Sequence, residues 1–145
     1  MKKITKSFLI LCLAVTLCVC NSHVMASELQ TSYSTITPRW SHLSDVTFSF
    51  AATSSGGHVD ISYAGYPDSF ANVDVNVKLQ KKFLLVFWTD VDEWSTSSTD
   101  DYGNFYHCFA LNGTGTYKAT LTFTVTGTDG TVDTYTDEIE SKYSN

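Results

Sequence analysis

Residues 113–131 read GTGTYKATLTFTVTGTDGT, and this stretch decides the fold class. From Tyr117 to Val125 every second residue is apolar, and Thr or Lys stands at each position between. A side-chain period of two predicts a β-strand with one face buried and the other in water. The glycines at both ends of the run predict turns.

The end of this stretch also predicts how the strand pairs with the next one. A two-residue turn at the Asp-Gly dipeptide would set the apolar face of one strand against the polar face of the other. A three-residue loop over 128–130 places Phe123 opposite Tyr135 instead. This loop requires Gly130 in the left-handed region. The same register turns Asp137 inward, which predicts an edge strand or a second irregularity.

Similar alternation recurs along the chain from residue 43 to its end, and no helical period stands out after the first segment. Seven short strands with frequent turns predict an all-β fold, an immunoglobulin-like antiparallel β-sandwich of about seven strands. A closed barrel is the alternative. The domain is expected over 43–145, after a loose segment at 27–42. The expected strands lie within 45–51, 58–64, 72–80, 83–94, 104–111, 116–125 and 131–140.

Tyr117 stands just before the apolar run of the penultimate strand, in the pattern G-x-Y-x-A. In immunoglobulin-like sandwiches this is the position of the tyrosine corner, whose hydroxyl bonds to backbone upstream. We predict a structural role for Tyr117 rather than ligand binding. Ala119 occupies the position at which antibody domains carry a Cys, in agreement with a fold that has no inter-sheet disulfide.

The first 26 residues have the pattern of a secretory signal peptide, which is expected to form an N-terminal signal helix. A basic start, MKKITK, precedes an apolar run over 7–20, and small-residue spacing predicts cleavage after Ala26. The run is shorter than the ~20 residues that span a bilayer. Leu or Val precedes each Cys of the run, so a lipid anchor is not expected. We predict a secreted, extracellular protein.

Removal of this segment changes the charge and cysteine content of the chain. It takes three of the nine basic residues and none of the 15 acidic ones, which leaves a net charge of −9. That balance argues against nucleic acid or an anionic membrane as a partner, because both require clustered Lys and Arg. Cys108 remains alone, so we expect a buried, inert thiol and a monomer. A disulfide between two chains is left open.

The chain resembles a family of small secreted β-sandwich proteins of Gram-positive bacteria that have no assigned activity. The resemblance lies in TPRW at 37–40, in VKLQ leading to Trp88-x-x-Val91-x-x-Trp94, and in GTYKATLTFTV at 115–125. It implies the fold and the compartment. It implies no catalytic residues.

The sequence offers little for catalysis, and we expect no enzyme activity, no catalytic residue, no cofactor and no metal site. His42, His58 and His107 lie in three different segments, without the spacing of metal ligands on one element. No G-x-S-x-G, H-E-x-x-H or glycine-rich phosphate loop is present.

Acidic residues gather in two neighbouring stretches of the chain. The plainest interpretation is a solvated surface. A weak calcium site is one alternative, since Ca²⁺ binds oxygen ligands from loops. A small hydrolase that uses Asp92 or Glu93 is another. The candidate calcium ligands are Asp90, Asp92, Asp100 and Asp101.

Aromatic and apolar residues of 83–94 give the candidate contact site. On a regular strand, two Trp residues and two Asp residues would share one face, with the Trp residues roughly 20 Å apart. Such a face could stack on sugar rings, unless the Trp residues fill the core. The run FLLVFW is apolar on both faces, which favours a hairpin with its tip near 83–86. The candidate contacts are Phe83, Leu84, Trp88, Asp90, Asp92 and Trp94.

These features together predict a secreted, non-enzymatic domain that binds a protein or a component of the cell envelope. The alternative is a carbohydrate-binding module that uses Trp88 and Trp94. The two are distinguished by titration with soluble glycans while Trp fluorescence is followed.

Overall fold

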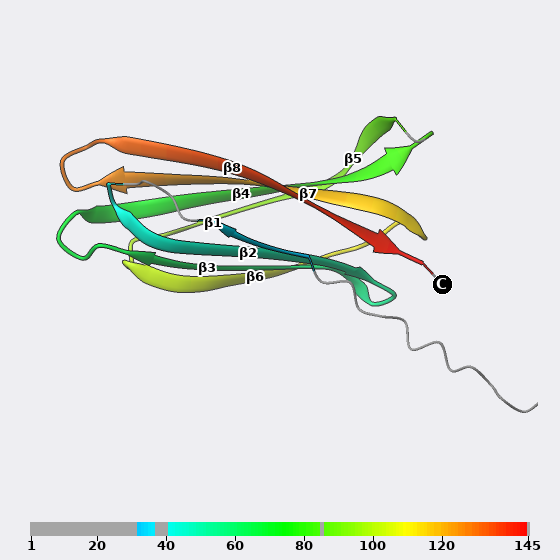
Figure 1. Ribbon diagram of the computed structural model, residues 1–145, viewed down its shortest axis with the longest axis horizontal. Helices are drawn as coiled ribbons and strands as arrows, with labels where there is room; N and C mark the ends of the chain where they lie inside the picture. Colours follow the sequence, from blue (N-terminus) through cyan, green and yellow to red (C-terminus); the bar gives the residue numbers. More distant parts are fainter. Residues whose placement is uncertain (1–31, 37–40, 85, 145) are drawn as a thin grey trace, which may run out of the picture.

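The computed structural model describes residues 32–36, 41–84 and 86–144, with the backbone alone for 33–36. The described residues form eight β-strands and no helix (Figure 1). No helix that could cross a membrane is therefore found among them. The strands are β1 Ser32–Ile36, β2 Leu43–Thr53, β3 Gly56–Gly65, β4 Phe70–Phe83, β5 Phe87–Ser98, β6 Tyr102–Phe109, β7 Gly115–Gly127 and β8 Val132–Tyr143.

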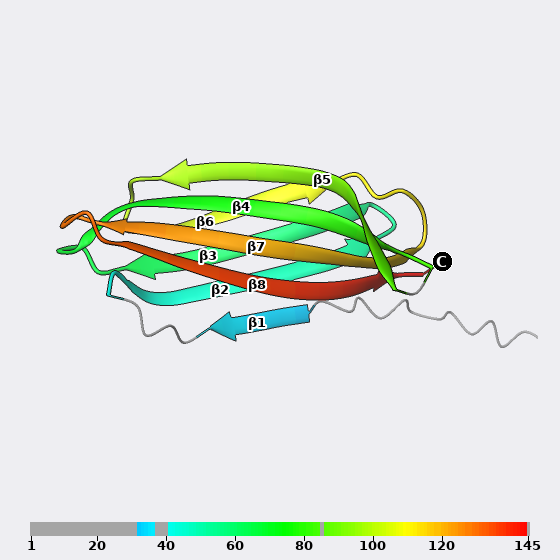
Figure 2. The same ribbon diagram turned by 90° about the horizontal axis from the view of Figure 1, so that it is seen from above.

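The strands form two four-stranded antiparallel sheets that pack face to face (Figure 2). The first sheet has the order β1-β2-β3-β6, and the second has the order β5-β4-β7-β8. Strands β2, β3 and β6 take the positions that immunoglobulin domains call A, B and E, and β4, β7 and β8 take positions C, F and G. β5 lies beside β4, at position C′. The expected immunoglobulin-like sandwich is confirmed, and the barrel alternative is wrong.

One strand lies where the sequence predicted a loose segment. β1 pairs antiparallel with β2, from Ser32 opposite Phe50 to Ile36 opposite Val46. The prediction for 27–42 is therefore wrong at 32–36. The free backbone edge of β2 supplies the hydrogen bonds, so an added edge strand requires no long apolar period of its own. The signal peptide and its cleavage site lie outside the described residues.

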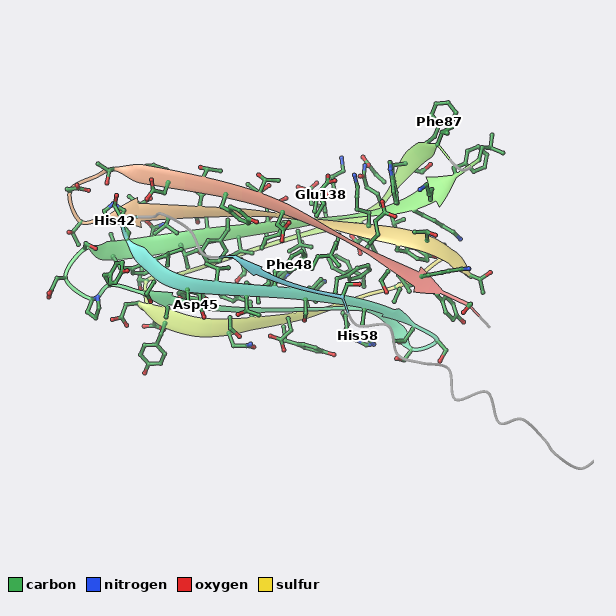
Figure 3. The ribbon with its side chains drawn as sticks, viewed as in Figure 1. His42, Asp45, Phe48, His58, Phe87 and Glu138 are labelled. Carbon is green, nitrogen blue, oxygen red and sulfur yellow. The ribbon has the colours of Figure 1, made fainter. Side chains whose placement is uncertain are left out.

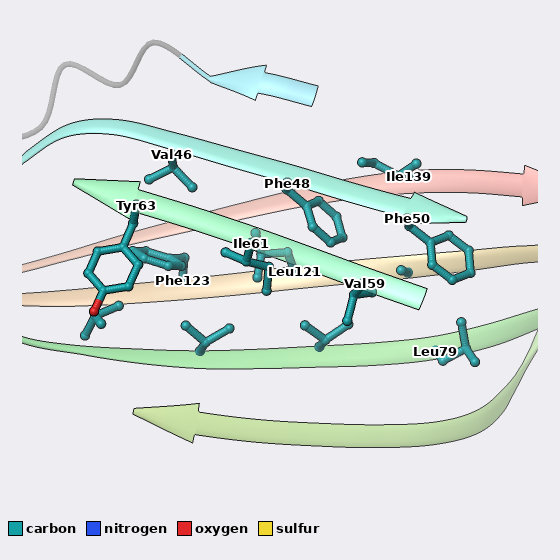
Figure 4. Packing of buried hydrophobic residues seen from close by; sticks show 14 of the residues in the cluster. Val46, Phe48, Phe50, Val59, Ile61, Tyr63, Leu79, Leu121, Phe123 and Ile139 are labelled. Carbon is teal, nitrogen blue, oxygen red and sulfur yellow. The ribbon is translucent and has the colours of Figure 1, made fainter. Parts of the chain in front are cut away.

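Alternate residues of both sheets fill the space between them (Figure 4). β7 confirms the opening prediction, because its residues alternate between buried and half-buried from Tyr117 to the end of the strand. Burial of these side chains is the main favourable term in folding, at roughly 25 cal/mol per Å² of apolar surface. The largest fully buried apolar side chains include Phe48, Phe50, Ile61, Leu79, Tyr117, Leu121 and Phe123.

The hairpin of β7 and β8 has the predicted register. Phe123 pairs with Tyr135, and a three-residue loop over 128–130 separates Gly127 from Thr131. The Gly127 N–H donates to the Thr131 carbonyl at 2.8 Å, and Gly130 has φ +82°. β8 is an edge strand, as the inward position of Asp137 predicted, and the Oδ2 atom of that residue is buried without a hydrogen-bond partner.

Tyr117 forms the predicted tyrosine corner. Its side chain is fully buried, and its hydroxyl donates a hydrogen bond of 2.6 Å to the Gly113 carbonyl. The bond ties the crossover between β6 and β7 to the start of β7. The structural role predicted for Tyr117 follows from this contact.

The hairpin of β4 and β5 is long, and its end rises away from the two packed sheets (Figure 1). Phe83 pairs with Phe87, so the chain turns between these two residues, in agreement with the predicted hairpin. The pairing shifts register once: Leu79 faces Asp92, whereas Gln80 faces Asp90. Val91 is therefore an extra residue in β5, a β-bulge.

Candidate functional site: an apolar hairpin tip

The tip of the β4–β5 hairpin exposes four large apolar side chains. Phe83 is 58% exposed, Leu84 68%, Val86 69% and Phe87 63%. We call these four residues the hairpin tip. Figure 3 shows Phe87 at the far end of the hairpin, well away from the sandwich. A soluble domain rarely exposes a contiguous apolar patch unless that patch contacts something.

The turn of the hairpin tip adopts an unfavourable backbone conformation. Leu84 has φ +48°, in the left-handed region, and no other non-glycine residue of the described chain has a positive φ. A side chain in this region costs about 1–2 kcal/mol relative to glycine, because Cβ approaches the carbonyl oxygen. A glycine there would favour stability, so the Leu is not explained by folding.

Lysine and aromatic side chains brace the base of the hairpin. The Nζ atoms of Lys82 and Lys118 lie 5.2 and 4.9 Å from the centre of the Trp88 ring. The Nζ atom of Lys81 lies 5.3 Å from the ring of Tyr117 and donates to the Asn112 carbonyl. The cation–π contacts of Lys82 and Lys118 hold Trp88 on the outer face of the second sheet.

The acidic residues below the lysines are paired. Asp90 accepts from Lys78 at 2.8 Å and from Gln80 at 2.7 Å. The hydrogen bond from Lys78, followed by that from Gln80, lowers the pKa of Asp90, and the same contact raises the pKa of Lys78. Glu138 accepts from Lys118 at 3.0 Å, which lowers the pKa of Glu138. Charge close to the hairpin base is thereby balanced.

A hollow of about 260 Å³ lies under the hairpin tip. Its lining combines apolar atoms of Phe83 and Val91 with polar atoms of Lys81, Thr89 and Asn112. The hollow adjoins the exposed patch, so a contacting molecule could occupy both.

The structure does not place the two Trp residues on one face, and the prediction that they share one is wrong. The bulge at Val91 reverses the side-chain parity of β5 between Trp88 and Trp94. Trp88 points outward, whereas Trp94 pairs with the core residue Val77. The Trp94 ring stacks on His107 at 4.7 Å and packs against the core.

The acidic residues named in the sequence do not converge either. Asp92 lies opposite Leu79, on the side of the strand away from Asp90. Asp100 and Asp101 follow the other end of β5. Over the part of the chain that the structure describes, no three His, Cys, Asp or Glu side chains are grouped in a way that could hold a metal ion.

Cys108 is exposed, and the prediction of a buried thiol is wrong. Residues 103, 105, 107 and 109 of β6 face inward, so Cys108 faces outward opposite His58. The His58 Nδ1 lies 3.3 Å from the Cys108 Sγ and 3.0 Å from the Tyr106 hydroxyl. The thiol donates to Tyr106 at 3.3 Å, and this hydrogen bond raises the pKa of the Tyr106 hydroxyl.

Sequence reasoning missed this cluster because it considered Cys108 without a residue from another strand. The relevant partner is the residue on the adjacent strand, and β3 pairs with β6 across 50 residues of sequence. A correct alignment of the two strands was the signal that could have found it.

The outer face of the second sheet is a polar surface. A shallow hollow of about 380 Å³ lies between β5, β4 and β7. Hydroxyl and amide groups line it, with one carboxylate, and the lining includes Asp74, Asn76, Ser95, Ser97, Thr122 and Thr124. Such groups can form hydrogen bonds with a polar ligand, but none of them is aromatic.

The described residues thus form an immunoglobulin-like β-sandwich with a projecting apolar hairpin. No protein-family model matches the chain, and a comparison with curated proteins finds no match.

Proposed function

We propose that this protein is a secreted, non-enzymatic binding domain and that the hairpin tip contacts a protein or a component of the cell envelope. The observation that carries the proposal is the exposure of four large apolar side chains at the end of one hairpin. Burial of such side chains against a partner removes apolar surface from water, which is the main driving force of association.

The arrangement around the hairpin tip supports this function. Strand pairing and the contact of Lys82 with Trp88 hold the base of the hairpin in one conformation. Little conformational freedom is therefore lost when a partner binds. Phe83 and Phe87 lie opposite each other and present two rings together. Large aromatic side chains carry much of the binding energy in protein interfaces.

A carbohydrate-binding module is the second candidate. One observation favours it: Trp88 lies on the same outer face as the polar hollow of the second sheet. Sugar hydroxyls could bond to the Ser, Thr and Asn side chains there. Trp94 packs against the core and cannot take part in the same contact.

The test compares two exposed aromatic residues at different ends of the molecule. Phe87→Ser removes a ring from the hairpin tip, whereas Tyr102→Ser removes a ring that is 74% exposed on β6. Binding of purified protein to isolated cell envelopes of the source organism is measured by sedimentation. We expect Phe87→Ser to weaken binding roughly tenfold or more, as for loss of a central aromatic contact, and Tyr102→Ser to leave it unchanged.

Equal binding by both variants would contradict the proposal. A change in Trp88 fluorescence on titration with soluble glycans, lost in Trp88→Ala, would favour the carbohydrate module instead.

A further inference from the structure

We propose that the hairpin tip inserts into the interfacial region of an anionic lipid bilayer. This inference rests on the proposed function and names the partner of the same site. Its basis is the order of side chains along the hairpin, together with the distribution of lysines over the described residues.

The side chains along the hairpin follow the layers of a membrane surface. Phe83, Leu84, Val86 and Phe87 form the outermost layer and match the acyl region. The next cross-strand pair is Lys82 with Trp88, a cation and an amphipathic ring, which suit the headgroup level. The following level holds the Lys78–Asp90 ion pair, which remains in water.

Lysine is concentrated at this end of the molecule. All five lysines of the described residues lie on β4, β7 and β8, in the half of the second sheet nearest the hairpin tip. Lys142 pairs with Thr116, at the start of β7, and so adds a charge at the same end. Long lysine side chains can extend to phosphate groups while their stems lie along apolar surface. These lysines are Lys78, Lys81, Lys82, Lys118 and Lys142.

The opposite end of the sandwich carries acidic turns. Asp68, Asp100, Asp101 and Asp129 lie in the connections between strands there, remote from the hairpin tip (Figure 1). β7 spans 13 residues, roughly 40 Å, several times the ~8 Å over which charge acts at physiological salt. The half that carries the lysines also holds five acidic residues, and Lys78 and Lys118 are paired with two of them, so this half is close to neutral whereas the far end is acidic. These acidic residues are Asp90, Asp92, Glu93, Glu138 and Glu140. The asymmetry orients the hairpin tip toward an anionic surface.

The shape of the hairpin tip favours lipid over a protein partner. Phe83 and Phe87 lie opposite each other at the two ends of a narrow turn, and the hairpin rises away from the sheets. A fluid bilayer can close around such a projection. A protein partner would require a matching cavity, because affinity depends on close packing of the interface core.

Vesicle binding by purified protein tests this inference. Sedimentation is measured with vesicles of equimolar phosphatidylcholine and phosphatidylglycerol, and with vesicles of phosphatidylcholine alone. We expect binding to the anionic vesicles, with a blue shift of Trp fluorescence that is absent in Trp88→Phe. Phe83→Ser/Phe87→Ser and Lys82→Gln/Lys142→Gln should each weaken this binding roughly tenfold or more. The exposed residue Val132 supplies the control: Val132→Ser should bind as the unmodified protein does.

The outcomes separate this inference from the proposed function. Envelope binding that depends on Phe87, without binding to either vesicle, would overturn the lipid inference and leave a protein partner. Equal binding to both vesicles would overturn the requirement for anionic lipid. Hairpin-tip variants that match the unmodified protein in every assay would overturn both.

Discussion

At the scale of single residues, the hydroxyl of Tyr117 connects a crossover to the core. Tyr117→Phe removes the bond to Gly113 and keeps the buried ring. We expect it to lower the free energy of unfolding by about 1–2 kcal/mol, since an acceptor is left unpaired. Tyr117→Ala should cost about 3–5 kcal/mol, because the ring is lost as well. Urea denaturation measures both variants, and a neutral Tyr117→Phe would show that the bond contributes nothing to stability.

The thiol of Cys108 is a second residue with a direct test. Because its side chain faces solvent beside His58 and Tyr106, folded protein should react with a thiol reagent without prior unfolding. The rate of labelling is compared in buffer and in denaturant, with Cys108→Ser as the unreactive control for the domain. Labelling that requires denaturant would contradict the outward orientation of Cys108.

At the scale of elements, the β7–β8 hairpin depends on one left-handed residue. A Cβ atom added to Gly130 would meet nothing within 4 Å, so substitution there tests the backbone alone. We expect Gly130→Ala to lower the free energy of unfolding by about 1 kcal/mol. Gly130→Asn should cost less, because Asn tolerates this conformation. Equal stability of Gly130→Ala and the unmodified protein, measured by urea denaturation, would contradict the inferred role of the loop.

At the scale of the whole molecule, paired carboxylates make stability depend on pH. Hydrogen bonds from Lys78, Thr131 and Lys118 lower the pKa values of Asp90, Asp129 and Glu138 respectively. A carboxyl group whose pKa is lower in the folded state stabilises the fold above its unfolded value, near ~4. That contribution is lost as pH falls through the folded value.

We therefore expect the urea midpoint to vary little from about pH 7 to pH 5 and to fall below about pH 4. Glu138→Gln should reduce this acid sensitivity, because the group no longer titrates. A midpoint that stays constant down to about pH 3 would show that these pairs add no pH-dependent stability.

Features that depend on local alternation could be predicted from the sequence. The period of two in β7 predicted its buried face, the register of Phe123 with Tyr135 and the conformation of Gly130. The apolar run that starts at Phe83 predicted a hairpin tip, because no single buried face could accommodate it. These are properties of one strand or of two strands joined by a short loop, so neighbouring residues contain the information.

Features that depend on a distant strand could not be predicted and are known from the folded chain. The bulge at Val91 separates Trp88 from Trp94, and nothing in the alternation of β5 reveals it. Pairing of β6 with β3 turns the His107 side chain inward. β1 forms because the edge of β2 has backbone groups free for hydrogen bonding. Strand pairing satisfies backbone hydrogen bonds whatever the side chains are. Such contacts therefore leave little trace in the sequence of either strand.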